Sequence, residues 1–431
     1  MEVRHRKKKQ PEAASVSDTE TDTEVESVSV TEGGTSTSKP KPTGHSKGES
    51  KLAKLVNRLF FGTALLFVLC GVIAAGHLAT LGLVVLVQVM MFRELVNVRY
   101  SNREFKDLPL YRTTQWLWFG TSLFYSYGST FFSEKYRHLI KSPTIVQLLP
   151  FVELISLALY SGMLILTVLT LKKGYYKYQM GQLAWTISTI VITVVQVKSF
   201  TDNIFAGLFW FLFPVSLVIC NDSMAYFCGM GCGRKLIRRP FLSISPNKTW
   251  EGFLGGAVCT CLFAFAFPRL LVQFDFLICP CEDLSASLFS LKCPAPEVFT
   301  MADYRLPSPL ALLLRSGNVR LYPIQLHALL LGLFASLVAP FGGFFASGIK
   351  RAYKLDDFAS IIPGHGGVYD RVDCQLIMGL ATSIYYTTFI AEDLDVSASR
   401  LYQLAIKMPS EEQLALYMQL ADALRAQKLI R

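Results

Sequence analysis

Hydrophobic residues gather into long runs that recur between residues 59 and 391, with shorter polar stretches between them. The bilayer interior offers no water to the backbone, so each membrane-embedded run must bond its own N–H and C=O groups as a helix. The pattern predicts an all-α fold, a polytopic integral membrane helical bundle of about nine transmembrane helices. The expected helices span 59–76, 78–92, 113–132, 145–171, 182–197, 204–220, 252–272, 326–346 and 374–391.

Composition agrees with a membrane protein. Of the 431 residues, 52% are hydrophobic and 17% are charged, whereas soluble domains are about one quarter charged. The net charge of +10 raises the possibility of a nucleic-acid partner. Because the Lys and Arg lie mainly in loops between apolar runs, they indicate contact with lipid and phosphate instead, and no nucleic-acid partner is expected.

The two ends of the chain differ from its middle. Residues 1–50 contain no Leu, Ile, Phe, Tyr or Trp but 15 Ser or Thr, so they cannot bury enough apolar surface to order themselves and predict a disordered cytosolic tail. Residues 51–395 form the expected membrane-embedded catalytic domain. Residues 396–431 are expected to be an amphipathic helical segment, because Leu414, Tyr417, Ala421 and Leu424 share one helical face.

Basic residues predict the orientation in the membrane. The N-terminus and the loops 93–112, 172–181 and 228–250 are expected in the cytosol, and the short 198–203 turn and the long 273–325 loop in the lumen. The 133–144 loop does not fit this distribution of basic residues between the two sides. The side of the membrane on which the C-terminus lies stays open. The 273–325 loop holds three cysteines, so its disulfide pairing is undetermined.

The first polar segment that stands out among the apolar runs covers residues 221–256. Asp222 directly follows an expected helix, and a charged residue at membrane depth is usually functional. Gly229, Gly231 and Gly233 could let backbone N–H groups approach an anion. Hydroxyl, amide and amino groups then precede the next helix and form a candidate phosphate site. These residues are Ser245, Asn247, Lys248, Thr249 and Glu251.

The second polar segment covers residues 347–373 and begins with Lys350 and Arg351. His365, Gly366 and Gly367 form a turn, which Asp370, Arg371 and Asp373 follow. Two carboxylates three residues apart share a helical face, and hard oxygen ligands suit Mg²⁺. A surface ion-pair cluster around Arg371 is the alternative interpretation.

Taken together, the two segments resemble the phosphatidate cytidylyltransferases, or CDP-diacylglycerol synthases, of the eukaryotic kind. One family pattern stands here as Ser347, Lys350, Arg351, Pro363, His365, Gly366, Gly367, Asp370, Arg371 and Asp373. Two shorter patterns stand as Asp222, Ala225, Tyr226 and Gly229, and as Ser245, Pro246, Lys248, Thr249, Glu251 and Gly252. The family usually has Lys at the position of Asp356, which puts one phosphate contact in doubt.

The resemblance implies an enzyme that condenses CTP with phosphatidic acid to give CDP-diacylglycerol and pyrophosphate. It implies Mg²⁺ held by Asp222, Asp370 and Asp373. Phosphate contacts or catalytic groups would be Lys248, Lys350, Arg351, His365 and Arg371; CTP would also meet Ser245, Asn247, Thr249, Glu251, Gly366 and Gly367. It further implies a homodimer in the endoplasmic reticulum membrane, with the active site facing the cytosol.

Three other functions remain open at this stage. A transporter would also carry charge inside the membrane, although here the polar residues cluster in two segments. Another CTP-using lipid enzyme, such as a polyprenol kinase, would share the phosphate-binding chemistry. An inactive relative of the cytidylyltransferases is the third possibility, because of Asp356.

Overall fold

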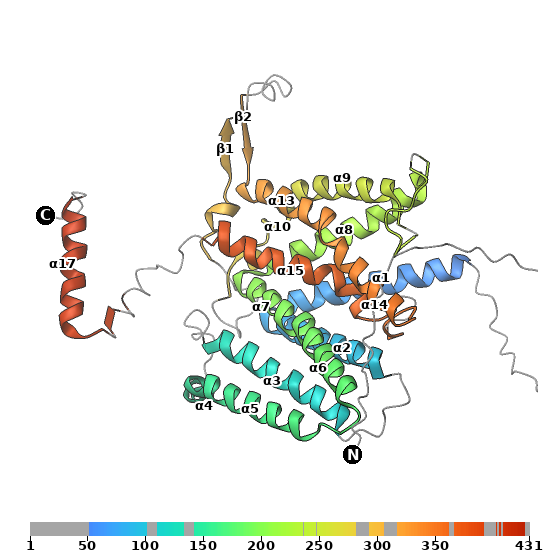
Figure 1. Cartoon of the computed structure of the whole chain (residues 1–431). Coiled ribbons are helices and arrows are strands. Elements are labelled where there is room, and N and C mark those ends of the chain that lie inside the picture. The colour runs from blue at the N-terminus through green and yellow to red at the C-terminus, as the bar shows by residue number, and fades with distance from the viewer. Residues whose placement is uncertain are drawn as a thin grey trace, which may run out of the picture. The chain divides into compact units, whose positions relative to one another are not determined.

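The computed structural model describes residues 51–100, 110–132, 142–235, 237–246, 248–281, 293–305, 317–361, 366–391, 402, 405–406 and 408–426. The expected tail, the domain boundary near residue 395, most of the 133–144 loop, Asn247 and His365 lie outside these residues. The described part is almost wholly helical, which confirms the all-α fold (Figure 1).

Helices occur at each of the nine expected places. They are α1 Lys51–Ala75, α2 His77–Tyr100, α3 Tyr111–Phe132, α4 Pro143–Leu148 with α5 Val152–Leu169, α6 Tyr176–Ile190 with α7 Gln196–Ala206, α8 Leu208–Cys232, α9 Trp250–Ala266 with α10 Pro268–Leu271, α13 Pro323–Leu337 with α14 Pro340–Ala352, and α15 Tyr369–Phe389. The last described helix, α17, spans Ser410–Ala426.

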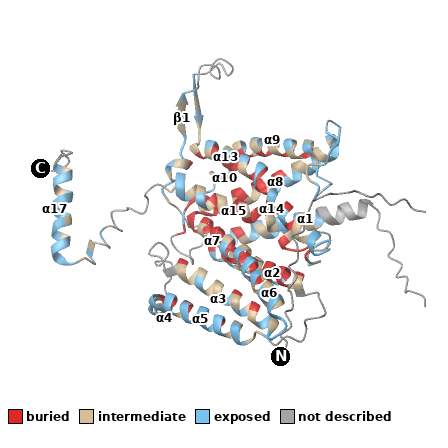
Figure 2. Cartoon of the chain, viewed as in Figure 1, coloured by how far each residue is buried: buried red, intermediate tan, exposed pale blue. Residues whose placement is uncertain are grey.

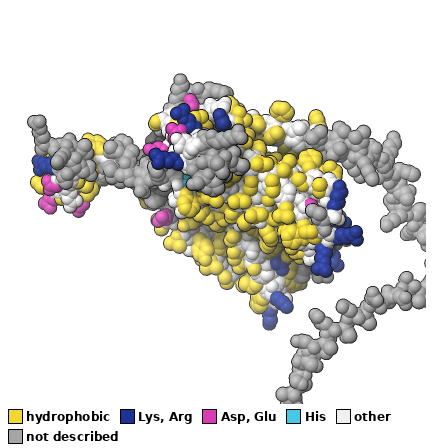
Figure 3. Space-filling view, turned by 90° about the horizontal axis from the view of Figure 1, so that it is seen from above, with side chains coloured by type: hydrophobic (Ala, Val, Ile, Leu, Met, Phe, Trp, Pro, Cys, Tyr) yellow, Lys and Arg dark blue, Asp and Glu magenta, His cyan; other side chains and the backbone are white. Residues whose placement is uncertain are grey.

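Within the described residues, six helical segments are long and apolar enough to cross a membrane, and they identify a multi-pass protein. They are His77–Arg99, Leu149–Leu169, Tyr176–Ala206, Leu208–Cys232, Trp250–Leu271 and Pro323–Ala352. Hydrophobic side chains cover a broad band of the molecular face in Figure 3, and Lys and Arg gather mainly at its margins. Such a band is the surface that a hydrocarbon core requires.

The core lies where α2, α7, α8 and α15 meet, and α3 and α5 form an outer layer (Figure 2). Half of the most apolar 18-residue stretch of α8 is buried, whereas only 17% of the corresponding stretch that ends with α5 is buried. Phe209, Trp210 and Phe213 of α8 are among the largest fully buried side chains. α8, which carries Asp222, therefore lies at the centre of the helical bundle and packs against its neighbours with large buried side chains.

Two predicted boundaries are wrong. The chain does not turn at 198–203 but stays helical through a π-helical turn, Val191–Val195, to Ala206, and turns at Gly207. Gly207 has φ +135°, and a Cβ there would meet the carbonyl oxygens of residues 277–279 at 3.3–3.4 Å. Only glycine adopts this geometry readily, so one residue replaces the expected loop.

The second error concerns Asp222, which was expected to follow a helix that ended at residue 220. α8 continues to Cys232, so Asp222 lies inside it. Gly229 and Gly231 are therefore helical, and they do not form the expected loop for an anion. The helix runs on because its small residues allow a close neighbour, as described below.

The long 273–325 loop has structure of its own. It contains a short helix α11, Asp275–Ile278, a 3-10 turn η6, Glu297–Phe299, and an antiparallel hairpin of β1, Ala302–Arg305, and β2, Asn318–Leu321. A disulfide joins Cys279 to Cys293, and the buried Cys281 takes no part in it. The pairing that the sequence left open is thus Cys279 with Cys293.

Candidate active site

α8 and α9 pack very closely beside the first polar segment. A Cβ on Gly252 would lie 2.8 Å from the carbonyl oxygen of Ala225, and one on Gly256 would lie 2.9 Å from the Ala225 Cβ. Glycine at these positions lets the two backbones approach. The approach brings the start of α9 beside Asp222 and the following turn of α8.

Thr249 caps the N-terminus of α9. Its hydroxyl accepts a hydrogen bond of 3.1 Å from the Gly252 amide, as an N-cap residue does. Lys248 precedes the cap with its side chain exposed, and its charge interacts with Asp222. A helix N-terminus next to a lysine favours a phosphate group.

Glu251 holds the preceding loop in place. Its carboxylate accepts hydrogen bonds from the Arg234 and Ile237 amides, at 3.1 and 2.8 Å. The Arg234 side chain donates to the Pro246 carbonyl at 2.9 Å. Ser245 lies in this loop, and its carbonyl accepts from the Lys248 amide. In this structure Glu251 and Ser245 shape the loop that carries Lys248, and neither lines the adjacent cavity.

That cavity has a volume of about 330 Å³ and lies among α8, α9 and the start of α14. Asp222, Lys248 and Thr249 supply its polar side chains beside Asn221 and Tyr226. Aromatic residues of the loop, α9 and α14 supply the apolar wall; they are Phe241, Phe253 and Phe344. A pocket with a few polar groups on a mainly apolar wall suits a ligand that is part polar and part hydrocarbon.

α14 packs against the first turn of α15 through a second pair of glycines. A Cβ on Gly342 would lie 2.5 Å from the Asp373 carbonyl oxygen, and one on Gly343 would lie 3.4 Å from Asp373 Oδ2. Asp373 interacts electrostatically with both Asp222 and Asp370. The carboxylates of the two polar segments thus lie within each other's field, although about 150 residues separate them in sequence.

Asp370 is engaged differently from Asp373. Its Oδ1 lies 2.7 Å from Lys350 Nζ, and its Oδ2 accepts hydrogen bonds from the Phe358 and Gly367 amides at 3.1 and 3.2 Å. The Asp370 side chain is 5% exposed and that of Lys350 19%. The ion pair therefore ties the end of α14 to the first turn of α15, and the two amide bonds tie that turn to the preceding loop.

Glu94 is the residue that the sequence reasoning missed. It lies in α2, is 1% exposed, and accepts hydrogen bonds of 2.8 Å from both the Val368 and the Tyr369 amides. A Cβ on Gly367 would lie 2.8 Å from Glu94 Oε2. The carboxylate accepts from backbone amides at the start of α15 that have no partner within the helix. In the sequence, the one sign of a functional role for Glu94 is an acidic residue directly after an apolar run.

The other expected residues lie around this centre. Arg371 is exposed, and its positive charge interacts with the Asp222 carboxylate. Gly366, with φ +79°, lies against the Asp357 carboxylate. Arg351 is exposed at the end of α14. Within the described ranges, no three His, Cys, Asp or Glu side chains gather as ligands of one metal ion.

Comparisons with known proteins show which family the chain resembles. A model of the "Cytidylyltransferase family" matches residues 56–389. The chain is 38% identical over 388 residues to a "Probable phosphatidate cytidylyltransferase" of Dictyostelium discoideum, covering 87% of this chain and 79% of that protein. It is 39% identical over 363 residues to "Phosphatidate cytidylyltransferase 1" of Arabidopsis thaliana (82% and 84%) and 39% over 347 residues to "Phosphatidate cytidylyltransferase 1" of Homo sapiens (80% and 74%).

The matched residues contain both polar segments, the α8–α9 cavity and the ion pair of α14 and α15. They also contain Glu94 and the three carboxylates of the candidate site. A family model over most of the chain, together with relatives at nearly 40% identity, shows that this chain belongs to the cytidylyltransferase family.

Proposed function

We propose that this protein transfers the CMP moiety of CTP to phosphatidic acid, which gives CDP-diacylglycerol and pyrophosphate. The observation that carries the proposal is the cavity between α8 and α9, which holds Lys248, Thr249 and Asp222 beside an apolar wall. Tyr226 and Met230, on its rim, are largely exposed. A lipid phosphate has access to this cavity along the exposed face of α8.

The reaction needs no covalent enzyme intermediate. An oxygen of the lipid phosphate, already ionised at neutral pH, attacks the α-phosphorus of CTP. The bond from that phosphorus to the bridging oxygen breaks, and pyrophosphate leaves. Lys248 and the N-terminus of α9 bind the phosphates, and Arg371 adds positive charge nearby. Their task is to position the phosphates and stabilise charge, which supplies most of the catalysis in phosphoryl-type transfers.

Mg²⁺ belongs to the proposal. Asp222 and Asp373 fit it best, because they are hard oxygen donors of like charge that act on each other from different helices. When bound, the ion would neutralise charge on the phosphates. Asp370 fits less well, since Lys350 and two amides already use its oxygens. We assign it the positioning of Lys350.

The proposal includes the endoplasmic reticulum membrane and a site that faces the cytosol. Trp250–Leu271 would extend roughly 30 Å as a helix. It starts at the cap Thr249 and leads to the Cys279–Cys293 disulfide. Disulfides persist in oxidising compartments, which supports a luminal disulfide and a cytosolic Lys248. The homodimer that the resemblance implies is proposed as well, and light scattering of the solubilised protein tests it.

The test of activity uses purified protein in detergent–phospholipid micelles and two samples of CTP, one labelled at the α-phosphate and the other at the γ-phosphate. Label from the α-phosphate in a chloroform-soluble product that depends on phosphatidic acid supports the proposal. Transfer of the γ-phosphate to a polyprenol would support the kinase alternative. No transfer of either label, by protein with a normal melting temperature, would favour the inactive relative.

A further inference from the structure

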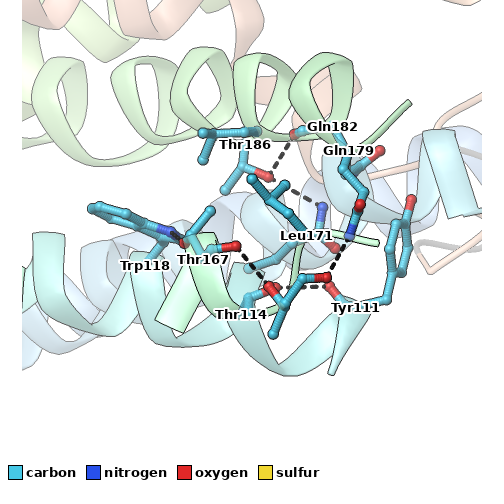
Figure 4. A pocket seen from close by; sticks show the side chains of 11 residues that line it. Tyr111, Thr114, Trp118, Thr167, Leu171, Gln179, Gln182 and Thr186 are labelled. Atoms are coloured by element: carbon cyan, nitrogen blue, oxygen red, sulfur yellow. Dashed lines mark hydrogen bonds between the residues drawn. The ribbon is translucent and has the colours of Figure 1, made fainter. Parts of the chain in front are cut away.

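A second cavity, of about 50 Å³, lies among α3, α5 and α6 and shares no lining residue with the active-site cavity (Figure 4). α3 lines it with Tyr111, Thr114 and Trp118, and α6 lines it with Gln182 and Thr186. On both helices the polar residues recur every three or four positions, so each helix presents a polar stripe. Such stripes are unusual between helices of an outer membrane layer and require a reason.

Part of the hydrogen-bonding capacity in this cavity is used internally. The Gln115 amide nitrogen donates to Thr186 Oγ1 at 3.2 Å, and Trp118 Nε1 donates to Thr167 Oγ1 at 3.0 Å. The Gln179 side chain bonds backbone groups of residues 170 and 172. These bonds hold the three helices together around the cavity.

Gln182 is different. Its side chain is buried, with the residue 5% exposed, and within the described structure neither its amide nitrogen nor its amide oxygen has a partner. The Gln115 side-chain oxygen also has none. An unsatisfied buried polar group costs about 1–3 kcal/mol, and hydrocarbon cannot supply the missing bonds. Two glutamines that line the cavity therefore have one donor group and two acceptors without a partner in the described structure.

The lining also limits the charge of that ligand. Among the described residues, none of the side chains that line the cavity is charged. Lys172 and Lys177 lie on the adjoining segment but do not line it. A buried phosphate or carboxylate would have no countercharge, which is costly. The ligand group is therefore uncharged, and a hydroxyl, which both donates and accepts, matches the free groups of Gln182 and Gln115.

The position of the cavity along the helices points to lipid. The turn between α5 and α6 borders it, and this turn carries Lys172 and the exposed Tyr175 and Tyr176. Lys and Tyr together mark the membrane–water interface. α5 exposes Ile165 and Leu169 nearby. A volume of 50 Å³ is room for about four water molecules, enough for a hydroxyl and the few atoms beside it but too small for a sugar or a nucleotide.

We propose that this cavity binds the uncharged hydroxyl head of a neutral membrane lipid. Diacylglycerol, ceramide and cholesterol all carry such a head, and the test separates them. The proposed site is independent of the transferase reaction, since its residues belong to α3, α5 and α6 rather than to the α8–α9 cavity.

The experiment uses the full chain in phosphatidylcholine nanodiscs with a photoactivatable diacylglycerol whose reactive group is near the hydroxyl. We expect cross-links concentrated in peptides that contain residues 111–118 and 167–186. An excess of at least one of the three hydroxyl lipids should compete, which identifies the source. Triacylglycerol, which has no hydroxyl, should not compete.

Gln182→Met keeps the length of the side chain and removes both hydrogen-bonding groups. We expect labelling of these peptides to fall at least tenfold, with a melting temperature at or above that of the wild type, because the variant removes two unsatisfied buried groups. Gln88→Met is the control for the loss of a buried glutamine and should leave this labelling unchanged, because Gln88 of α2 is fully buried, lies outside the cavity and accepts its hydrogen bond from Tyr127. Gln115→Met is the second variant if the first does not fold. Labelling spread evenly over the lipid-facing helices and insensitive to either cavity variant would mean that water alone fills the cavity, and would overturn the proposal.

Discussion

The carboxylate of Glu94 accepts a hydrogen bond of 2.8 Å from the Val368 amide, 274 residues away in the chain. A second bond, from the Tyr369 amide, makes Glu94 the cap of α15. α2 thereby fixes the loop that leads to Asp370 and Asp373.

We expect Glu94→Gln to lower CMP transfer at least tenfold, because a glutamine oxygen can accept from one amide while its NH₂ group faces the other. The loop should also exchange its amide hydrogens faster, which hydrogen-exchange mass spectrometry of the 355–372 peptide measures. Glu153→Gln, in the exposed first turn of α5, is the control and should change neither. Normal exchange together with low activity in Glu94→Gln would contradict a positioning role.

The Lys350–Asp370 pair leads to a prediction about stability. Asp370→Asn leaves the largely buried Lys350 ammonium without its partner, so the free energy of unfolding should fall by about 3 kcal/mol. Asp373→Asn should leave it nearly unchanged, because Asp373 lies among like charges. Melting temperatures of both solubilised variants provide the comparison. Equal melting temperatures would show that the ion pair contributes little.

Close packing of α8 and α9 can be tested with two glycines. Gly256→Ala places a methyl group within about 3 Å of Ala225 backbone atoms, so α9 must shift. We expect a loss of about 1–3 kcal/mol in stability and weaker CTP binding. Gly231→Ala, on α8, meets nothing within 4 Å and should be neutral or stabilising by about 0.5–1 kcal/mol. A Gly256→Ala protein that melts and binds CTP like wild type would contradict the close contact.

Orientation is tested with single cysteines in a background that keeps only the disulfide pair Cys279 and Cys293. A cysteine at Lys235, in the exposed loop before α9, should react with a membrane-impermeant thiol reagent on intact microsomes. A cysteine at the exposed Gly317, beside β2, should react only after the membrane is opened. The reverse pattern would place Lys248 in the lumen.

Hydrophobic runs were enough to predict the helices, because a run that crosses a bilayer has no other way to satisfy its backbone. They failed where tertiary contacts decide. α8 continues through its polar and glycine-rich end because α9 packs on it at Gly229 and Gly252. The turn at Gly207 depends on carbonyl groups of residues 277–279 that no local pattern reveals.

The site was predictable only in part for the same reason. The spacing of Asp370 and Asp373 placed them on one turn, and the structure has both at the start of α15. The sequence does not reveal that the two carboxylates have different partners. Those of Asp370, Lys350 and the Phe358 amide, come from another helix and from a loop. Glu94 was assigned to a loop because its apolar run was expected to end at residue 92, and its partners lie 274 and 275 residues away.

Asp222 and Asp373 yield the last prediction, which concerns Mg²⁺. If the two carboxylates share the ion, Asp222→Asn and Asp373→Asn each remove a ligand while keeping the side-chain volume. CMP transfer should fall at least 100-fold in each, as expected when metal stabilisation of a transferring phosphate is lost. Without Mg²⁺ the Asp373→Asn variant should melt at or above the wild-type temperature, because Asp373 lies among carboxylates that repel it when no cation lies between them.

Melting temperatures measured across a Mg²⁺ titration separate a loss of metal binding from a loss of catalysis. The wild-type melting temperature should rise with Mg²⁺, since a ligand that binds only the folded state stabilises it. The rise should be absent in both variants and present in Asp303→Asn, which changes an exposed acid on β1. A variant that keeps the full Mg²⁺-dependent rise and near-normal transfer would remove its residue from the metal site. A variant that keeps the rise but loses transfer would instead give that carboxylate a role toward the substrate phosphates.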